Sequence, residues 1–233
     1  MKKEIESLKK VIDSGNKIVA ITGAGISMSA GIKDMEHLDF FSTLQMMSET
    51  MLKMNPKHYY NIVRKGFLDA AFSSHGTVTH KKLAELEHNG KVTGIITTNI
   101  DCMHTLAGSV NVAEIQGSFQ INKCLKCGNM YHDIDLWNRG NAPKCLKCGG
   151  AICPFPVYSK VGVYDPAIRK ARKWISEADV ILIIGSKGMY GNTYFQNRNI
   201  HAKIVQINPK NTGFENIAML NIHNKADEIF EHI

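Results

Sequence analysis

Short runs of consecutive apolar residues dominate the hydrophobic pattern of this chain, and helical patterns separate them. The runs are rich in β-branched residues, which is typical of strands buried on both faces in a parallel sheet. Strands alternating with helices predict an α/β fold built on a doubly wound parallel sheet. The predicted strands span residues 17–22, 92–97, 112–115, 180–184 and 203–207, and the helices span 3–14, 80–89, about 167–176 and 225–232.

Two segments interrupt this α/β rhythm. Residues 32–72 are helical in pattern, rich in methionine and broken by Pro56, whereas residues 119–154 are rich in cysteine, glycine and proline. The first segment is too long for a simple connection between strands. We therefore expect it to contribute to a second, smaller lobe or a lid.

Composition indicates an ordinary globular protein, with 44% hydrophobic and 21% charged residues. No apolar run has the length of a membrane span, and the N-terminal MKKEIESLKK resembles an amphipathic helix more than a signal peptide. We expect a cytoplasmic protein that does not bind membranes.

The net charge of +7 raises the question of nucleic acid. Lysine and arginine are scattered, however, and the densest cluster (Arg169, Lys170, Arg172 and Lys173) has the spacing of one solvated helix face. We do not expect direct binding of nucleic acid; a basic surface instead favours an acidic partner.

The cysteines predict a metal site. Cys124 and Cys127 form one C-x2-C pair, and Cys145 and Cys148 form another after a gap of seventeen residues. This spacing matches a zinc ribbon in which four thiolates fill the tetrahedral positions of one ion. With no position left open, the zinc is expected to be structural. Cys102 and Cys153 remain, and both are expected to be buried in the core.

The first predicted strand leads into a glycine-rich turn, Gly23-Ala24-Gly25, before Ser27. Such a turn at a helix N-terminus presents backbone N–H groups to an anion, and glycine lets a diphosphate approach closely. Met28 stands where a dinucleotide fingerprint requires a third glycine. The loop alone therefore predicts a nucleotide site but no particular chemistry.

Polar residues also follow the other predicted strands. The carboxyl ends of parallel strands meet at one edge of the sheet, where such folds bind ligands. Together with the glycine loop, these turns favour a dinucleotide lying across the sheet. They comprise residues 97–101 with His104, Gln116-Gly117-Ser118, Gly185-Ser186 and Asn208-Pro209.

Motifs along nearly the whole chain resemble the sirtuin family. They are GAGIS with AGI and Asp34, TTNIDxxHTLAG, EIQGSF, the two cysteine pairs, CGG-A-I-x-P, EADVILIIGS and IVQINP. The resemblance implies a Rossmann-type large domain (residues 1–34, 90–118 and 157–233) and a small domain (a helical module, 35–89, and a zinc ribbon, 119–156). NAD⁺ would lie between the domains and be consumed as a co-substrate.

The resemblance also implies which residues contact NAD⁺. The glycine loop would hold the pyrophosphate and the adjoining ribose, and the turn after the second strand would hold the nicotinamide ribose and carboxamide. The ends of the last two strands would hold the adenosine ribose, and the start of the final helix would flank adenine. In that order the residues are Gly23, Ala24, Gly25 and Ser27; Asn99 and Asp101; Gly185, Ser186 and Asn208; Lys225 and Ala226. Ile26, Asp34, Thr98 and Ile100 are also expected at the cofactor.

Gln116 departs from the family pattern. In deacylating sirtuins this position is a histidine, which acts as a general base on a ribose hydroxyl after acyl-lysine has displaced nicotinamide. A carboxamide can hydrogen-bond to a hydroxyl but cannot accept its proton, and a general base typically contributes about 10²–10⁴-fold. Departure of nicotinamide needs no such base, only an electrostatic partner such as Asp101.

Further departures affect the substrate side. Lys33-Asp34-Met35-Glu36 replaces Pro-Asp-Phe-Arg, Thr98 replaces a glutamine, and Gly185-Ser186-Lys187 replaces Gly-Thr-Ser. Residues 153–159 lack the Phe-Gly-Glu that clamps acyl-lysine. Glutamine for histidine is also similar to the macrodomain-associated microbial sirtuins, which transfer ADP-ribose to a protein.

The expected function is therefore cleavage of NAD⁺ with transfer of ADP-ribose to an unidentified protein acceptor. Asn99 would orient the ribose or the nucleophile, Asp101 would stabilise positive charge, and Gln116 would position the ribose hydroxyls. One alternative is lysine deacylation with a compensating base, for which His104 and His75 are candidates. Another is a non-catalytic protein that binds NAD⁺ or ADP-ribose.

Overall fold

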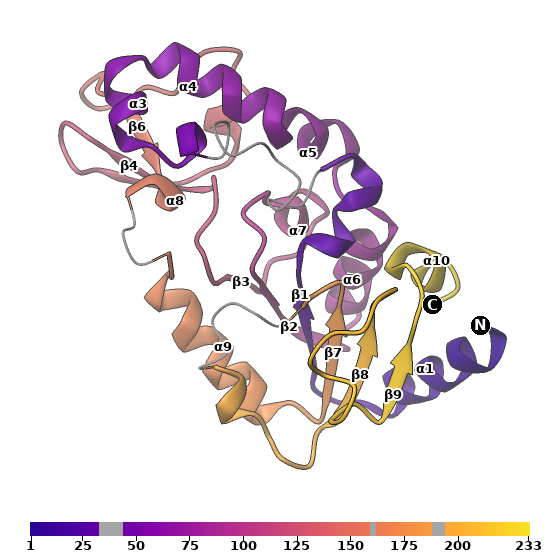
Figure 1. Cartoon of the computed structure of the whole chain (residues 1–233). Helices are drawn as coiled ribbons and strands as arrows, with labels where there is room; N and C mark the ends of the chain where they lie inside the picture. Colours follow the sequence, from indigo (N-terminus) through magenta and orange to yellow (C-terminus); the bar gives the residue numbers. More distant parts are fainter. Residues whose placement is uncertain (33–43, 159–161, 188–193) are drawn as a thin grey trace.

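The computed structural model describes residues 1–32, 44–158, 162–187 and 194–233. Within these ranges, six parallel strands form the main sheet in the order β3-β2-β1-β7-β8-β9 (Figure 1). The chain runs outward from β1 in one direction and returns to build the other half, so the strand order reverses between β1 and β7. The strands are β1 Ile18–Thr22, β2 Val92–Thr97, β3 Val112–Glu114, β7 Val180–Ile184, β8 Lys203–Ile207 and β9 Leu220–Ile222.

Helices cover both faces of this sheet (Figure 1). Alternate residues of β1 point to opposite faces: Ile18 and Ala20 join one hydrophobic cluster, and Val19 and Ile21 join the other. The continuous apolar runs of the sequence are explained by this two-sided burial. The first cluster lies under α1 (Lys2–Ser14), α6 (Val78–His88) and α10 (Ala226–Phe230), and the second under α9 (Asp165–Glu177).

A smaller lobe lies beyond the carboxyl ends of β1 and β2 (Figure 1). Its core contains Tyr59, Phe119 and Trp137, and the rings of Phe119 and Trp137 meet edge to face at 5.1 Å. In the described part of this lobe, a three-stranded antiparallel sheet has the order β5-β4-β6. Its elements are α3 Glu49–Met54, α4 Pro56–Val63, the π-turn η4 Arg64–Leu68, α5 Asp69–Ser74, β4 Ile121–Cys124, β5 Met130–His132, the 3-10 turn η5 Asp135–Trp137 and β6 Ile152–Pro154.

The predicted break at Pro56 is confirmed. Pro56 is the first residue of α4, where its missing N–H costs no helical hydrogen bond. Asn55 caps the helix by accepting a 3.1 Å hydrogen bond from the His58 N–H. Shorter helical segments connect the remaining elements: α7 Met103–Leu106, α8 Phe155–Tyr158 and the 3-10 turn η6 Phe195–Asn197.

The sheet and the small ribbon confirm the predicted fold class, with two local differences. The glycine turn does not open an α-helix: it continues into the 3-10 turns η1 (Ala24–Ile26) and η2 (Met28–Ala30), which end at Gly31 with φ +82°. Helix α6 packs on the main sheet, because Leu83 shares a cluster with Ile95 of β2. The small domain was predicted to include residues 35–89 and therefore this helix. The domain boundaries themselves stay predictions.

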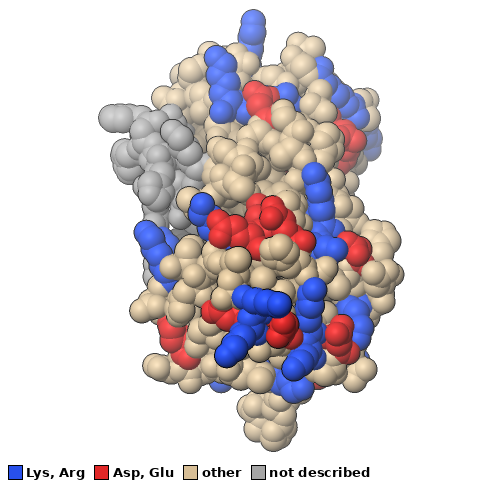
Figure 2. Space-filling view, turned by 90° about the vertical axis from the view of Figure 1, so that its right-hand side faces the viewer, with Lys and Arg blue, Asp and Glu red and all other residues tan. Residues whose placement is uncertain are grey.

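The charged side chains in Figure 2 show lysine and arginine interspersed with aspartate and glutamate over the face in view. The predicted solvated face of α9 is confirmed, since Arg169, Lys170, Arg172 and Lys173 are all exposed. No helix in the described ranges combines the length and apolar character needed to cross a membrane. The predicted cytoplasmic location stays a prediction.

Candidate active site

The glycine loop after β1 lies against the loop after β7, at the point where the strand order reverses. A Cβ on Gly23 would come within 2.8 Å of Ser186 Cα, and one on Gly25 within 2.8 Å of Gly185 Cα. Gly185 itself has φ +58°, a conformation that favours glycine. Glycine is therefore needed on both sides for the two loops to touch.

The backbone of this loop is more fully hydrogen-bonded than predicted. The N–H groups of Gly23 and Gly25 donate to the carbonyls of Ile184 (3.2 Å) and Gly185 (3.0 Å), and those of Ile26 and Ser27 donate within the turn. These four amides are thus already engaged by carbonyl groups. A phosphate placed here would depend on the remaining donors of the loop and on rearrangement of these bonds.

Ser27, Asn99 and Asp101 form one buried hydrogen-bonded network. The Ser27 hydroxyl donates to Asp101 Oδ2 at 2.7 Å, and Asn99 Nδ2 lies 3.2 Å from both Ser27 Oγ and the Gly23 carbonyl. Their exposed fractions are 1%, 9% and 5%. The turns after β1 and β2 therefore bring these three predicted site residues together.

Asp101 is a carboxyl group in a water-poor environment. Burial raises its pKa above the ordinary value, while hydrogen bonds from the Met103 N–H and the Ser27 hydroxyl act in the opposite direction. A carboxylate held by two donors in a low-dielectric site exerts a strong field on a neighbouring positive charge. Such a group can stabilise a cation that develops next to it.

Gln116 lies at the same edge, because the parallel register pairs Thr97 with Glu114. Asn99 lies two residues after Thr97, and Gln116 lies two residues after Glu114. Gln116 is half-buried, and its amide has no hydrogen-bond partner among the described residues. The amide is thus available to a ligand.

The turn after Gln116 is closely packed. Gly117 has φ +72°, and a Cβ there would lie 1.8 Å from Phe155 Cδ1. Phe155 in turn meets Tyr158 and Tyr164 edge to face, at 5.2 and 4.9 Å. This aromatic group therefore fixes the backbone on one side of Gln116.

The predicted adenosine-side residues occupy the loops after β7 and β8. Asn208 Nδ2 lies 3.4 Å from the Ser186 carbonyl, and both residues are almost fully buried. Lys225 is the exposed residue before α10, and Ala226 is buried at its start. Among the described residues, no hydrogen bond or ion pair joins Lys225 or Ala226 to the loops after β7 and β8, and their roles at NAD⁺ stay predictions.

The other predicted cofactor residues are divided between the loops. Ala24 and Ile26 belong to η1, and Thr98 and Ile100 flank Asn99 after β2. The Thr98 N–H donates to the Thr22 carbonyl at 3.3 Å, which ties the two loops together. Asp34, with the rest of Lys33-Asp34-Met35-Glu36, lies outside the described residues, as does Ser159.

The two histidines considered as replacement bases do not fit that role. His104 is buried, its ring centroid lies 4.6 Å from that of His80 with the planes tilted by 54°, and its Nε2 lies 2.8 Å from Thr22 Oγ1. Burial holds its pKa well below the ordinary value, and proximity to His80 adds to this. His75 is exposed at the end of α5 and makes no hydrogen bond to Ser27, Asn99 or Asp101.

Glu114 is a candidate that sequence reasoning missed. It is 5% exposed and accepts hydrogen bonds from Ser118 Oγ (2.6 Å) and Gln120 Nε2 (3.4 Å). Burial, reinforced by the charge of Asp101, raises its pKa to about 7. The available signal was an acidic residue inside an otherwise apolar strand, two positions before Gln116.

The four predicted zinc ligands come together in the small lobe. Their sulfur atoms lie within 4.8 Å of one another, with 3.4 Å between Cys124 and Cys148 and 3.6 Å between Cys127 and Cys145. Four thiolates around a tetrahedral zinc, each at about 2.3 Å, would be about 3.8 Å apart. The cluster therefore fits one zinc ion. Cys102 and Cys153 are buried elsewhere, as predicted.

The comparisons with known proteins agree with this arrangement. The model of the Sir2 family matches residues 23–189, which include the glycine loop, the buried network and the cysteine cluster. A protein of Clostridium perfringens named "NAD-dependent protein deacetylase" is 32% identical over 245 aligned positions, covering 98% of each chain. A Staphylococcus aureus protein of the same name is 32% identical and covers 96% of this chain and 95% of its own.

Solved structures show the same fold. The structure described as "Sir2-p53 peptide-NAD+" superposes with a TM-score of 0.76 at 25% identity, over 97% of this chain and 95% of that one. Another, "Structure of Sir2Tm bound to a propionylated peptide", gives the same score, identity and coverage. Both the sequence relatives and these structures span essentially the whole chain. The chain therefore belongs to the Sir2 family.

Proposed function

We propose that this protein breaks the nicotinamide–ribose bond of NAD⁺ and uses a protein as the acceptor. The observation that carries the proposal is the buried Ser27–Asn99–Asp101 network at the point where the strand order reverses. Ligands of open α/β sheets bind at such a point. Related proteins named as NAD-dependent deacetylases support the same choice of co-substrate.

Asp101 would act on the bond that breaks. Loss of nicotinamide leaves positive charge on the ribose, and a buried carboxylate held by two donors stabilises that charge without reorganisation. Asn99, whose amide is held by Ser27 and the Gly23 carbonyl, would fix the ribose in position. Both contributions precede any proton transfer.

We propose removal of an acyl group from lysine as the complete reaction. Relatives that match from end to end bear the name of NAD-dependent protein deacetylases, and one related structure contains a propionylated peptide. This reverses the order expected from the sequence, which put ADP-ribosyl transfer first. The protein acceptor would then be one that carries acylated lysine.

Transfer of ADP-ribose to a protein is the second candidate, favoured by Gln116. By the family resemblance, Gln116 stands where deacylating sirtuins have a basic histidine, and its amide cannot take a proton from a ribose hydroxyl. The structure offers no compensation from His104, which is enclosed by Thr22 and His80. If the second half of deacylation is slow, a nucleophile on another protein can attack the ribose carbon and become ADP-ribosylated.

One experiment separates these reactions. The zinc-loaded chain is incubated with NAD⁺ labelled in the adenylate portion, an acetyl-lysine peptide and a mixture of proteins, and all products are identified by mass spectrometry. Nicotinamide with acyl-ADP-ribose supports deacylation, and nicotinamide with labelled protein supports ADP-ribosyl transfer. If NAD⁺ binds but is never cleaved, both enzymatic reactions are excluded and the protein is a non-catalytic NAD⁺-binding protein.

The cysteine cluster would hold a structural zinc in this enzyme. All four positions of the ion are filled by Cys124, Cys127, Cys145 and Cys148, so no position is open to substrate. The zinc would fix the ribbon that packs against α4 around Trp137.

A further inference from the structure

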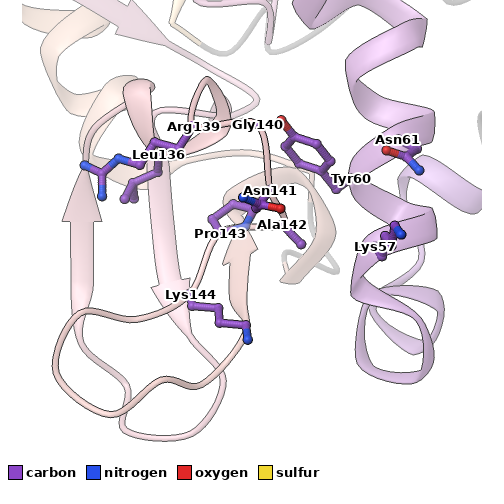
Figure 3. Close-up of a pocket in the computed structure, with 10 residues that line it drawn as sticks. All are labelled: Lys57, Tyr60, Asn61, Leu136, Arg139, Gly140, Asn141, Ala142, Pro143 and Lys144. Atoms are coloured by element: carbon purple, nitrogen blue, oxygen red, sulfur yellow. The ribbon is translucent and has the colours of Figure 1, made fainter.

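A groove on the small lobe lies between α4 and the zinc ribbon, away from the predicted NAD⁺ site. Its volume is about 550 Å³. Figure 3 shows one wall formed by α4 and the other by the loop that leads to the second cysteine pair. Its lining includes Lys57, Tyr60, Asn61, Asn141, Pro143 and Lys144.

The groove is longer than this cavity alone. A second cavity of about 180 Å³ shares Ala142, Pro143 and Lys144 with the first and continues past Pro56 to Gly149. The hollow therefore follows the seam between the helical module and the ribbon. Its extent suits a run of residues in an extended chain better than a compact small molecule.

The walls of the groove carry positive charge and no carboxylate. Lys57 projects from α4 and Lys144 from the opposite wall (Figure 3), and both are exposed. Among the described residues neither lysine has an ion-pair partner, whereas Arg139 lies 3.5 Å from Asp133. Two unpaired ammonium groups thus face a groove that offers them no counter-charge.

The floor is apolar and buried. Tyr60, Leu136 and Pro143 are buried, and the Tyr60 ring stacks on Trp137 at 6.4 Å with 13° between the planes. The amides of Asn61 and Asn141, one on each wall, can hydrogen-bond to a peptide backbone. Because Tyr60 is only 6% exposed, it offers no face on which a nucleobase could stack.

We propose that this groove binds an extended acidic segment of a protein partner. Carboxylates of the segment pair with Lys57 and Lys144, and its backbone hydrogen-bonds to the amides of Asn61 and Asn141. The chain has 28 basic residues and 21 acidic ones, and this excess of positive charge favours the approach of an acidic partner. The site is independent of the chemistry at the sheet edge.

The test measures binding of a fluorescein-labelled twelve-residue peptide of glutamate and alanine to the zinc-loaded full chain by fluorescence anisotropy at low salt. The same peptide with glutamine in place of glutamate is the reference. Lys57→Gln with Lys144→Gln is the groove variant. Lys2→Gln with Lys9→Gln on α1 removes the same charge elsewhere and is the matched control.

The groove variant is expected to raise the dissociation constant of the acidic peptide about fivefold, because it removes two exposed ion pairs that each contribute about twofold or slightly more. The control is expected to change it less than twofold. Lys57→Glu alone, which leaves the ribbon untouched, is expected to weaken binding at least as much. Zinc content and the melting temperature confirm that each variant is folded.

Three results would overturn the proposal. They are equal binding of the glutamate and glutamine peptides, equal loss of binding in the groove and α1 variants, or binding of inorganic tripolyphosphate that depends on Lys57 while the peptide does not bind. In the last case the groove takes a small anion rather than a polypeptide.

Discussion

Ser27 Oγ and Asp101 Oδ2 are joined by a 2.7 Å hydrogen bond between residues 74 positions apart in the chain. The bond links the glycine loop after β1 to the turn after β2, and Asn99 joins the same hydroxyl. A movement of the loop that is expected to bind phosphate would therefore also shift the carboxyl group that is expected to act on the ribose. We therefore expect cofactor binding and bond cleavage to depend on the same hydrogen-bonded network.

Replacing Gln116 by histidine should increase deacylation. A histidine supplies the proton acceptor that the carboxamide lacks, and such a base typically contributes about 10²–10⁴-fold. We expect Gln116→His to raise the rate of acetyl-lysine removal about 100-fold with little change in nicotinamide release. Mass spectrometry of the peptide gives the rate.

The matched control is Gln116→Ala, which removes the amide without adding a base. It should not gain deacylase activity. If Gln116→His is as slow as the unchanged protein, the missing base is not the main defect, and the altered segment around residues 153–159 limits deacylation instead.

Glu114 should make stability depend on pH. Its pKa is about 7 in the folded protein against an ordinary 4.5, so the folded state keeps a proton that the unfolded state loses between these values. Stability therefore falls as pH rises through that window, by about 3 kcal/mol from this group. Relative to the unchanged protein, the free energy of unfolding of Glu114→Gln should rise by about 3 kcal/mol between pH 4.5 and pH 8. Urea unfolding at a series of pH values measures this difference.

Glu231→Gln, at an exposed carboxylate, serves as the control and should follow the unchanged protein at every pH. Parallel curves for the Glu114 variant and the unchanged protein would show that the pKa of Glu114 is the same in the folded and the unfolded state.

Gly117→Ala should destabilise the protein more than Gly90→Ala. Both glycines have nearly the same backbone angle, +72° and +73°, but a Cβ at 117 meets Phe155 at 1.8 Å whereas one at 90 meets nothing within 4 Å. Left-handed backbone costs each variant about 1 kcal/mol, and overpacking adds about 1–3 kcal/mol at Gly117 only.

The melting temperature is the measurement, with an expected difference of about 2–12 °C between the two variants. Equal melting temperatures would mean that Phe155 moves away freely, and Phe155 would then not fix the backbone beside Gln116.

Chelation of zinc should unfold the small lobe first. The ribbon packs around Trp137, so loss of the ion should change tryptophan fluorescence and lower the melting temperature. Metal analysis should find about one zinc per chain, lost in Cys127→Ser but kept in Cys102→Ser, which is buried outside the cluster. Full zinc content in Cys127→Ser would contradict the assignment.

Five of the six strands of the main sheet could be predicted because each is mostly apolar and rich in β-branched residues. β2, β7 and β8 have the predicted bounds, and β1 differs by one residue at its start. β9 was missed because Leu220–Ile222 is short and contains Asn221, so no apolar run marks it. It forms as an edge strand through pairing with β8.

Less of the site could be predicted. The metal cluster could be predicted from the spacing of the cysteines alone, because the ligands of a zinc ribbon come in pairs that lie close together in the sequence. The bond between Ser27 and Asp101 depends on where two loops meet in space, which no spacing encodes. The 3-10 turns after Gly23 likewise follow from carbonyls of Ile184 and Gly185 that lie over 150 residues away in the sequence.

The most direct test of the account is nicotinamide release from NAD⁺ by the zinc-loaded protein, with and without an acetyl-lysine peptide, compared with Asp101→Asn. The amide is nearly isosteric but carries no charge, and a lost charge stabilisation of this kind costs about 10²–10³-fold. We predict nicotinamide release by the unchanged protein and at least 100-fold less by the variant, with NAD⁺ still bound. Absence of release from the unchanged protein, or equal rates for the two, would contradict the account.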